Sequence, residues 1–145
     1  MATRSRIAIE DEKGTVHSIY SHWDGYPSNN GKILFEHFQN SEKVKNLIAL
    51  GDLSSLAPEI ELAEGHTFEN PVKGVTVFYG RDRGEDGTEA KTHLDRNSFL
   101  RSDVEEYGYL FTNDGEWLMV DGHKSPNTRD FVLLEDVLNK NEYTE

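Results

Sequence analysis

The sequence predicts a single α+β domain over residues 1–145, built on a mostly antiparallel sheet of about five strands with three to four helices. Three observations support this. A length of 145 residues is typical of one domain. Short segments rich in β-branched and aromatic residues alternate with segments of helical periodicity. Turns that end in glycine join neighbouring strand candidates into hairpins.

In the first half of the chain, residues 6–9 and 15–23 are predicted to form a hairpin around the turn that ends at Gly14. A run of turn-forming residues follows, and a helix is then expected at 33–38, with His37 on its apolar face and Asn29 or Asn30 as its cap. A second helix is expected to begin at Ser41 and to end at Gly51.

The second half begins with an irregular stretch, residues 52–73, which is longer than an ordinary connection and is expected to pack against the fold or line a site. The pattern then predicts a strand at 75–79, a polar loop at 80–89 and a helix at 97–106. A hairpin at 109–120 turns on Asp114-Gly115, and a last helix lies within 131–140.

The charge narrows the classes of partner. The chain has 15 Lys and Arg against 27 Asp and Glu, a formal net charge of −12, and residues 1–50 hold six of each sign. The whole acidic excess therefore lies beyond residue 50. No Lys/Arg cluster forms, so duplex DNA binding is not expected. An acidic surface can repel nucleic acid, attract a basic partner or maintain solubility.

Targeting and redox signals indicate a cytoplasmic protein without membrane contact. No apolar run approaches the roughly 20 residues of a membrane helix, and the first residues lack the apolar core of a signal peptide. The chain has no cysteine, which excludes disulfides and thiolate metal sites and fits a reducing compartment.

The first segment with unusual chemistry spans residues 18–27. His22 and Asp24 are two residues apart and would project the same way along a strand, so Asp24 could orient His22 as a general base. Trp23 and Tyr26 offer flat faces to a base, sugar or cation. The alternative is structural: Trp23 and Tyr20 lie in the core, and Asp24-Gly25 is a turn.

The second such segment spans residues 79–87. Arg81 and Arg83, flanked by glycines, could bring guanidinium groups and backbone N–H groups to a phosphate or carboxylate. The Lys-Ser/Thr ending of a phosphate-binding P-loop is absent. The alternative is a surface loop whose arginines pair with Asp82, Glu85 or Asp86.

No metal or cofactor is expected. The six histidines lack the spacing of a zinc site. Asp24, Asp82 and Glu85 are too scattered in the sequence to indicate a cation site. No Gly-x-Ser-x-Gly nucleophile motif is present.

Two strings carry a resemblance: HWDGYP at residues 22–27 and GRDRGE at residues 80–85. With the strings at 18–21, 31–34 and 50–56, they resemble a family of small proteins encoded by bacteriophages and prophages, over about residues 3–90. The resemblance implies a viral accessory role in the host cytoplasm and no particular reaction.

The leading hypothesis is a non-catalytic binding protein, of the kind used in counter-defence, that sequesters a small anionic nucleotide-like ligand or a host protein. The expected contact residues are His22, Trp23, Asp24, Tyr26, Tyr79, Arg81, Asp82, Arg83 and Glu85. One alternative is a hydrolase or transferase acting on a phosphate-bearing substrate, with His22 as base and Asp24 as its orienter. Another is an acidic mimic of nucleic acid, and a homo-oligomer is compatible with each.

The two segments form one site only if the strands that precede them run in the same direction. We expect that arrangement, with Arg81 or Arg83 within salt-bridge reach of Asp24 or of an anion near it. Antiparallel strands would instead place the segments at opposite ends of the sheet.

Overall fold

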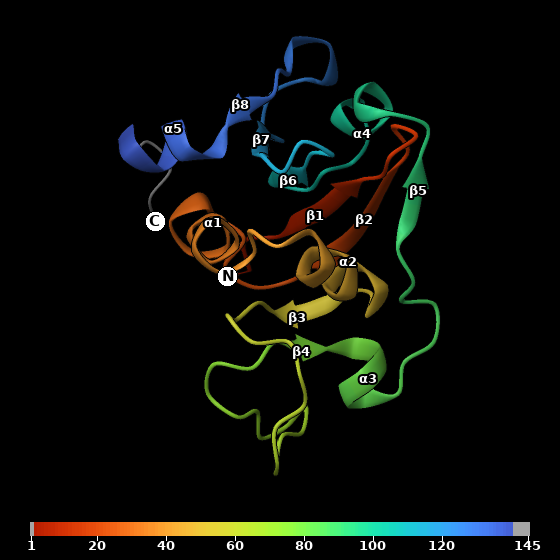
Figure 1. The fold of residues 1–145 in the computed structure, drawn as a ribbon, viewed down its shortest axis with the longest axis vertical. Helices are drawn as coiled ribbons and strands as arrows, with labels where there is room; N and C mark the ends of the chain where they lie inside the picture. The colour runs from red at the N-terminus through yellow and green to blue at the C-terminus, as the bar shows by residue number, and fades with distance from the viewer. Residues whose placement is uncertain (1, 141–145) are drawn as a thin grey trace.

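One open mixed sheet of eight strands runs through residues 2–140, the part of the chain that the computed structural model describes (Figure 1). The strand order is β4-β3-β2-β1-β6-β7-β8, and β5 pairs with β2 off this path. The strands are β1 (Ser5–Glu10), β2 (Val16–Ser21), β3 (Leu53–Ser55), β4 (Val77–Phe78), β5 (Lys91–His93), β6 (Tyr107–Phe111), β7 (Trp117–Asp121) and β8 (Val132–Leu133). The helices are α1 (Lys32–His37), α2 (Ser41–Ala49), α3 (Tyr79–Arg83), α4 (Arg96–Arg101) and α5 (Leu134–Lys140), with a π-helical turn at Pro27–Gly31 and a 3₁₀ turn at Pro126–Thr128.

The predicted α+β class is confirmed, while the sheet differs from the prediction in detail. The β1–β2 and β6–β7 hairpins form as expected. Two pairings are parallel, β1 with β6 and β2 with β3, so the sheet is mixed. Strands β3, β5 and β8 have only two or three residues each, too few to show an alternating pattern in the sequence. The predicted polar loop at 80–89 is also wrong at its start, because α3 covers Tyr79–Arg83.

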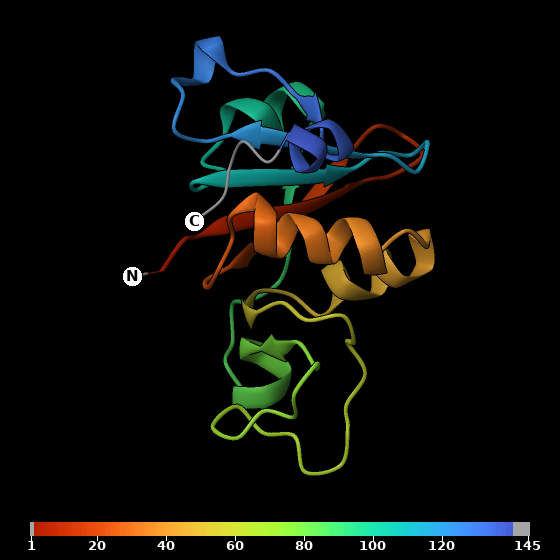
Figure 2. The same ribbon diagram turned by 90° about the vertical axis from the view of Figure 1, so that its left-hand side faces the viewer.

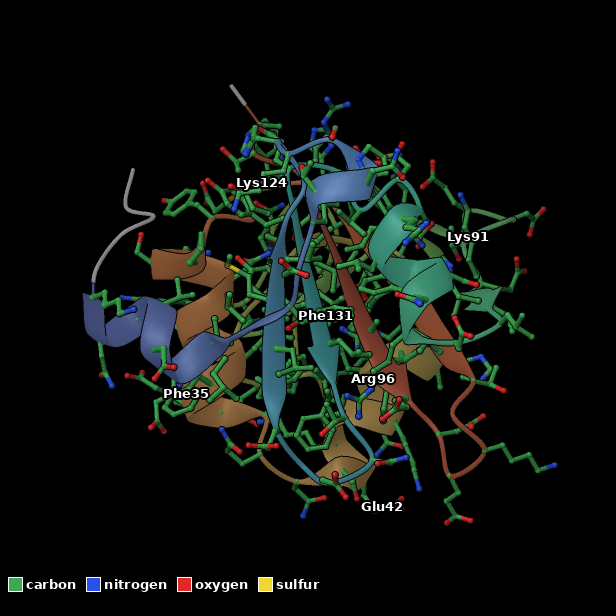
Figure 3. The ribbon with its side chains drawn as sticks, turned by 90° about the horizontal axis from the view of Figure 1, so that it is seen from above. Phe35, Glu42, Lys91, Arg96, Lys124 and Phe131 are labelled. Carbon is green, nitrogen blue, oxygen red and sulfur yellow. The ribbon has the colours of Figure 1, made fainter. Side chains whose placement is uncertain are left out.

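Helices cover both faces of the sheet. Helices α1, α2 and α5 pack on one face, where the larger apolar cluster includes Phe38, Leu47 and Tyr109. Helix α4 packs on the other face, where Phe99 lies in a second cluster. Figure 3 shows Phe35 of α1 and Arg96 of α4 on opposite sides of the central strands. Within residues 2–140 no helix combines the length and apolar character that a membrane crossing requires.

Helix α2 begins and ends as predicted, whereas two predictions about α1 are wrong. Asn40 caps α2 by accepting a hydrogen bond from the N–H of Glu42, and Gly51 follows it with φ = 84°. The expected core histidine of α1, His37, is exposed. The side chain of Asn30 bonds to serine hydroxyls of β1 and β2 and does not cap α1.

The outer edge of β2 is shared by two strands. Strand β3 pairs with β2 at Ser21, and β5 pairs with it over Val16–Ser18. Two side chains complete the edge: Asp52 accepts a hydrogen bond from the N–H of Tyr20 at 2.8 Å, and buried Arg6 donates to the carbonyl of Ser18 at 3.0 Å. Each adds a side-chain hydrogen bond to the backbone of this edge.

Residues 57–83 form an extension beyond β3, at the far end of the sheet from β8 (Figures 1 and 2). It contains the long irregular segment, β4 and α3. The segment makes a single bridge, between Glu59 and Val75, before β4. With few backbone hydrogen bonds across it, the segment also depends on side-chain contacts for its position.

Candidate functional site

The direction of the strands separates the two segments that were expected to form one site. Strand β2 is parallel to β3, and β3 is antiparallel to β4, so β2 and β4 run in opposite directions. Beyond β2, the N–H of Trp23 bonds to the carbonyl of Ser54; beyond β4, the N–H of Tyr79 bonds to that of Asp52. The two segments therefore leave opposite ends of this part of the sheet. The expectation of parallel strands was wrong because β3, unseen in the sequence, adds a reversal.

Arg81 does not pair with Asp24; it holds the extension together. Its Nε donates to Asp82 at 2.9 Å, one Nη donates to the carbonyl of Thr76 at 3.1 Å, and the other donates to that of Ile60. Its guanidinium also lies over the Phe78 ring, 4.8 Å from the centroid. These contacts leave Arg81 little capacity to bind an external anion.

Asp82 is the centre of this network. Its side chain is 2% exposed and accepts hydrogen bonds from the N–H of Phe78 at 2.8 Å and from Nε2 of the buried His66 at 3.2 Å. His66 accepts in turn from the N–H of Val72, which assigns the proton to Nε2. Burial alone would raise the pKa of Asp82, but the hydrogen bonds from Arg81, Phe78 and His66 lower it below its ordinary value. Asp82 is thus a charged anchor for the long segment.

Arg83 has a similar role at the surface. It donates to Glu85 at 2.6 Å, and its guanidinium lies 4.5 Å from the Phe68 centroid and 5.0 Å from that of Tyr79. The alternative interpretation of residues 79–87 is therefore confirmed in its pairings, Arg81 with Asp82 and Arg83 with Glu85. It was wrong about solvation, since Asp82 is buried.

His22 and Trp23 continue the line of β2 and project from it. The N–H groups of His22 and Trp23 bond to the carbonyls of Leu53 and Ser54. Tyr20 Oη lies 2.6 Å from Nδ1 of His22, and the His22 and Trp23 rings meet edge to face at 4.7 Å. The Trp23 side chain is nevertheless 43% exposed, so the structural alternative that placed it in the core is wrong.

The expected His22–Asp24 pair does not form. Asp24 has φ = 54°, in the left-handed region, so the chain leaves the strand direction at this residue. The carboxylate is exposed, and no hydrogen bond or ion pair joins it to His22 in the described chain. The partner of His22 is Tyr20, and burial raises the pKa of Tyr20, so its hydroxyl stays protonated. An orienting carboxylate for a general base is therefore missing.

The turn after Asp24 is tightly anchored. The N–H of Gly25 donates to the carbonyl of Thr3 at 2.7 Å, and the carbonyl of Gly25 accepts from the buried hydroxyl of Tyr109 at 2.6 Å. A Cβ at Gly25 would lie 2.7 Å from that of Ser5, so only glycine fits. Tyr26 is half-buried, and Pro27 after it is buried. The backbone that carries Trp23 is thus held on both sides.

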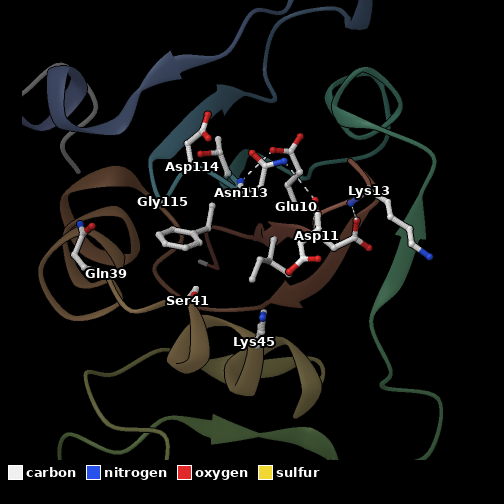
Figure 4. A pocket seen from close by; sticks show the side chains of 13 residues that line it. Glu10, Asp11, Lys13, Gln39, Ser41, Lys45, Asn113, Asp114 and Gly115 are labelled. Carbon is white, nitrogen blue, oxygen red and sulfur yellow. Dashed lines mark hydrogen bonds between the residues drawn. The ribbon is translucent and has the colours of Figure 1, made fainter.

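A cavity of about 580 Å³ lies elsewhere, at the end of the sheet where the parallel strands β1 and β6 finish (Figure 4). It is lined by the β1–β2 turn, the β6–β7 turn and the start of α2, and we call it the turn pocket. Its lining residues are Ile9, Glu10, Asp11, Glu12, Lys13, Gln39, Ser41, Lys45, Phe111, Thr112, Asn113, Asp114 and Gly115. The sequence analysis identified both turns but not the parallel pairing that brings them together.

Comparisons with protein-family models, curated proteins and solved structures found no match for this chain. Among residues 2–140 no group of three or more His, Asp or Glu side chains is arranged to hold a metal ion.

Proposed function

We propose that this is a non-catalytic binding protein that contacts a protein of its host through the Trp23 surface, defined as His22, Trp23, Asp24 and Tyr26. The observation that carries the proposal is an exposed tryptophan, 43% accessible, on a backbone anchored by hydrogen bonds on both sides. Tryptophan is enriched among the residues that dominate binding energies, and a fixed backbone lowers the entropy lost on binding.

Binding of a host protein is favoured over binding of a small anionic ligand because of where the cations lie. A nucleotide-like ligand stacked on Trp23 would need a cation for its phosphate, and Arg4, the arginine next to the Thr3–Gly25 contact, already lies 3.8 Å from Glu105. Arg81 and Arg83 are paired with Asp82 and Glu85. They belong to α3, which follows β4 and lies near the other end of β3 from Trp23. The phosphate-acting enzyme is disfavoured for the same reason, and because His22 bonds to Tyr20.

Charge supports a basic partner. The formal net charge of −12 favours association with a positively charged surface and raises the association rate. The resemblance to phage-encoded proteins supports action in the cytoplasm of a bacterial host, in a role such as counter-defence. On this proposal, Trp23 supplies affinity and the acidic surface supplies attraction at a distance.

The test compares Trp23→Ala with Leu94→Ala, which removes another large exposed apolar side chain, 81% accessible. Each form is used as bait in a host extract, captured proteins are purified, and their affinities are measured by calorimetry. A partner is expected whose affinity falls at least about tenfold with Trp23→Ala and stays within about twofold with Leu94→Ala.

Two results would contradict the proposal. One is that no captured partner distinguishes Trp23→Ala from the unmodified protein. The other is binding that salt abolishes but Trp23→Ala leaves unchanged, the behaviour of an acidic nucleic-acid mimic.

A further inference from the structure

We infer that the turn pocket binds a small organic amine: a primary ammonium or guanidinium group on a short apolar chain. This site is separate from the Trp23 surface. Its lining comes from the opposite end of β1 and β2, at Glu10–Lys13.

Size and floor define the type of ligand. A volume of about 580 Å³ lies within the usual range of small-molecule sites, roughly 300–1,000 Å³. Ile9 and Phe111, paired across the parallel strands β1 and β6, form an apolar floor. The floor favours a ligand with an apolar portion, because burying that portion releases water from both surfaces.

The charge of the wall defines the sign of the ligand. Glu10 is offset by Arg96, whose Nε and Nη donate at 2.6 and 2.8 Å. Asp11 accepts from the N–H groups of Lys13 and Thr15 and lies 3.2 Å from Nε2 of His17, so its lone pairs are largely engaged within the turn. Glu12 and Asp114 are exposed and have no ion pair within residues 2–140. Two carboxylates that form no ion pair in the described chain thus project from separate turns at the rim of one cavity.

The two lysines of the lining, Lys13 in the β1–β2 turn and Lys45 on α2, do not reverse this balance. Four carboxylates line the pocket against Lys13 and Lys45. Lys45 already pairs with Glu42 at 3.6 Å. An ammonium or guanidinium group is therefore favoured over a carboxylate or phosphate, and an ammonium at the rim would leave its alkyl chain over Phe111.

The experiment titrates the ¹⁵N-labelled full chain with agmatine and putrescine at low salt and follows backbone amide shifts. Equal concentrations of 1,4-butanediol and succinate serve as neutral and anionic probes of similar length. Both amines are expected to shift the amides of Phe111, Asn113 and Gly115 with saturation, while the diol and the diacid leave them unchanged.

Variants separate pocket binding from general attraction to an acidic protein. The double variant Glu12→Gln/Asp114→Asn is expected to weaken amine binding roughly tenfold. Glu64→Gln, at an exposed acid outside the pocket, should leave it within about twofold. Ser41→Trp, which fills the cavity from α2, should abolish the saturable shifts.

Three outcomes overturn the inference. The first is that no saturable shift appears up to about 10 mM amine. The others are equal shifts with succinate and an unchanged amine affinity in the double variant. A folded spectrum of each variant, required before titration, keeps every outcome interpretable. None of these results depends on Trp23.

Discussion

At the scale of single residues, several arginines of this protein stabilise the fold by donating hydrogen bonds to backbone carbonyls. Arg6 donates to the carbonyl of Ser18, and Arg81 donates to the carbonyls of Ile60 and Thr76. Arg129 donates to those of Leu100, Ser102, Gly122 and Lys124. A guanidinium has five donors in a rigid fork, so one side chain can satisfy several carbonyls that no strand or helix pairs. Cations counted in the sequence are therefore not cations free to bind a ligand.

The ion pair of Glu10 with Arg96 makes a testable contribution to stability. The hydrogen bonds from Arg96 lower the pKa of Glu10 below its ordinary 4.5. A lowered carboxyl pKa stabilises the fold fully above 4.5, and this contribution is lost as the pH falls through the folded-state value. Glu10→Gln should therefore lower the free energy of unfolding by about 1–2 kcal/mol at neutral pH and by progressively less in acid. This figure includes a discount for solvent screening, because Arg96 is partly exposed.

Urea unfolding of Glu10→Gln and the unmodified protein, from neutral to acidic pH, measures this difference. Glu64→Gln, at an exposed acid, is the control and should stay within about 0.5 kcal/mol throughout. A Glu10→Gln difference that does not shrink in acid would assign the cost to packing instead of the ion pair.

At the scale of elements, the junction of β3 with the segment before β5 depends on one glycine. Gly51 ends α2 with φ = 84°, and a Cβ there would lie 2.4 Å from the carbonyl oxygen of Thr88. That carbonyl accepts the N–H of Asp52, whose carboxylate completes the edge of β2. A side chain at Gly51 would therefore disturb both β3, which begins just after Asp52, and the edge of β2, which the Asp52 carboxylate completes.

Gly51→Ala is expected to cost at least about 3 kcal/mol, combining left-handed strain with a backbone clash. Gly14→Ala is the matched control, because Gly14 has φ = 83° but open space around it, and should cost about 1 kcal/mol. Thermal and urea unfolding measure both. Equal losses in the two variants would show that the contact with Thr88 does not matter.

At the scale of the whole molecule, the sequence predicts what is local. The β1–β2 and β6–β7 hairpins, α2 and the position of α5 follow from turn residues and periodicity. The parallel pairing of β1 with β6 joins residues about a hundred positions apart and leaves no local pattern. The turn pocket depends on that pairing, and the separation of the two predicted loops depends on the three-residue strand β3. The turn pocket and the separation of the two loops therefore depend on contacts between residues far apart in the sequence, which local patterns do not reveal.

Two segments of the chain have different roles in this account: residues 80–85 stabilise the fold, and Trp23 is exposed for binding. The most direct measurement is the free energy of unfolding of Arg81→Ala beside that of Trp23→Ala, by urea denaturation at neutral pH. Arg81→Ala should lose about 3 kcal/mol, because it removes the cation that balances the buried carboxylate of Asp82 and the donor to the carbonyls of Ile60 and Thr76. Trp23→Ala should lose less than about 1 kcal/mol, because Trp23 lies outside the core, is 43% exposed and packs on His22 alone among the aromatic side chains of the described chain. The reverse order, with Trp23 essential to stability and Arg81 dispensable, would contradict the account.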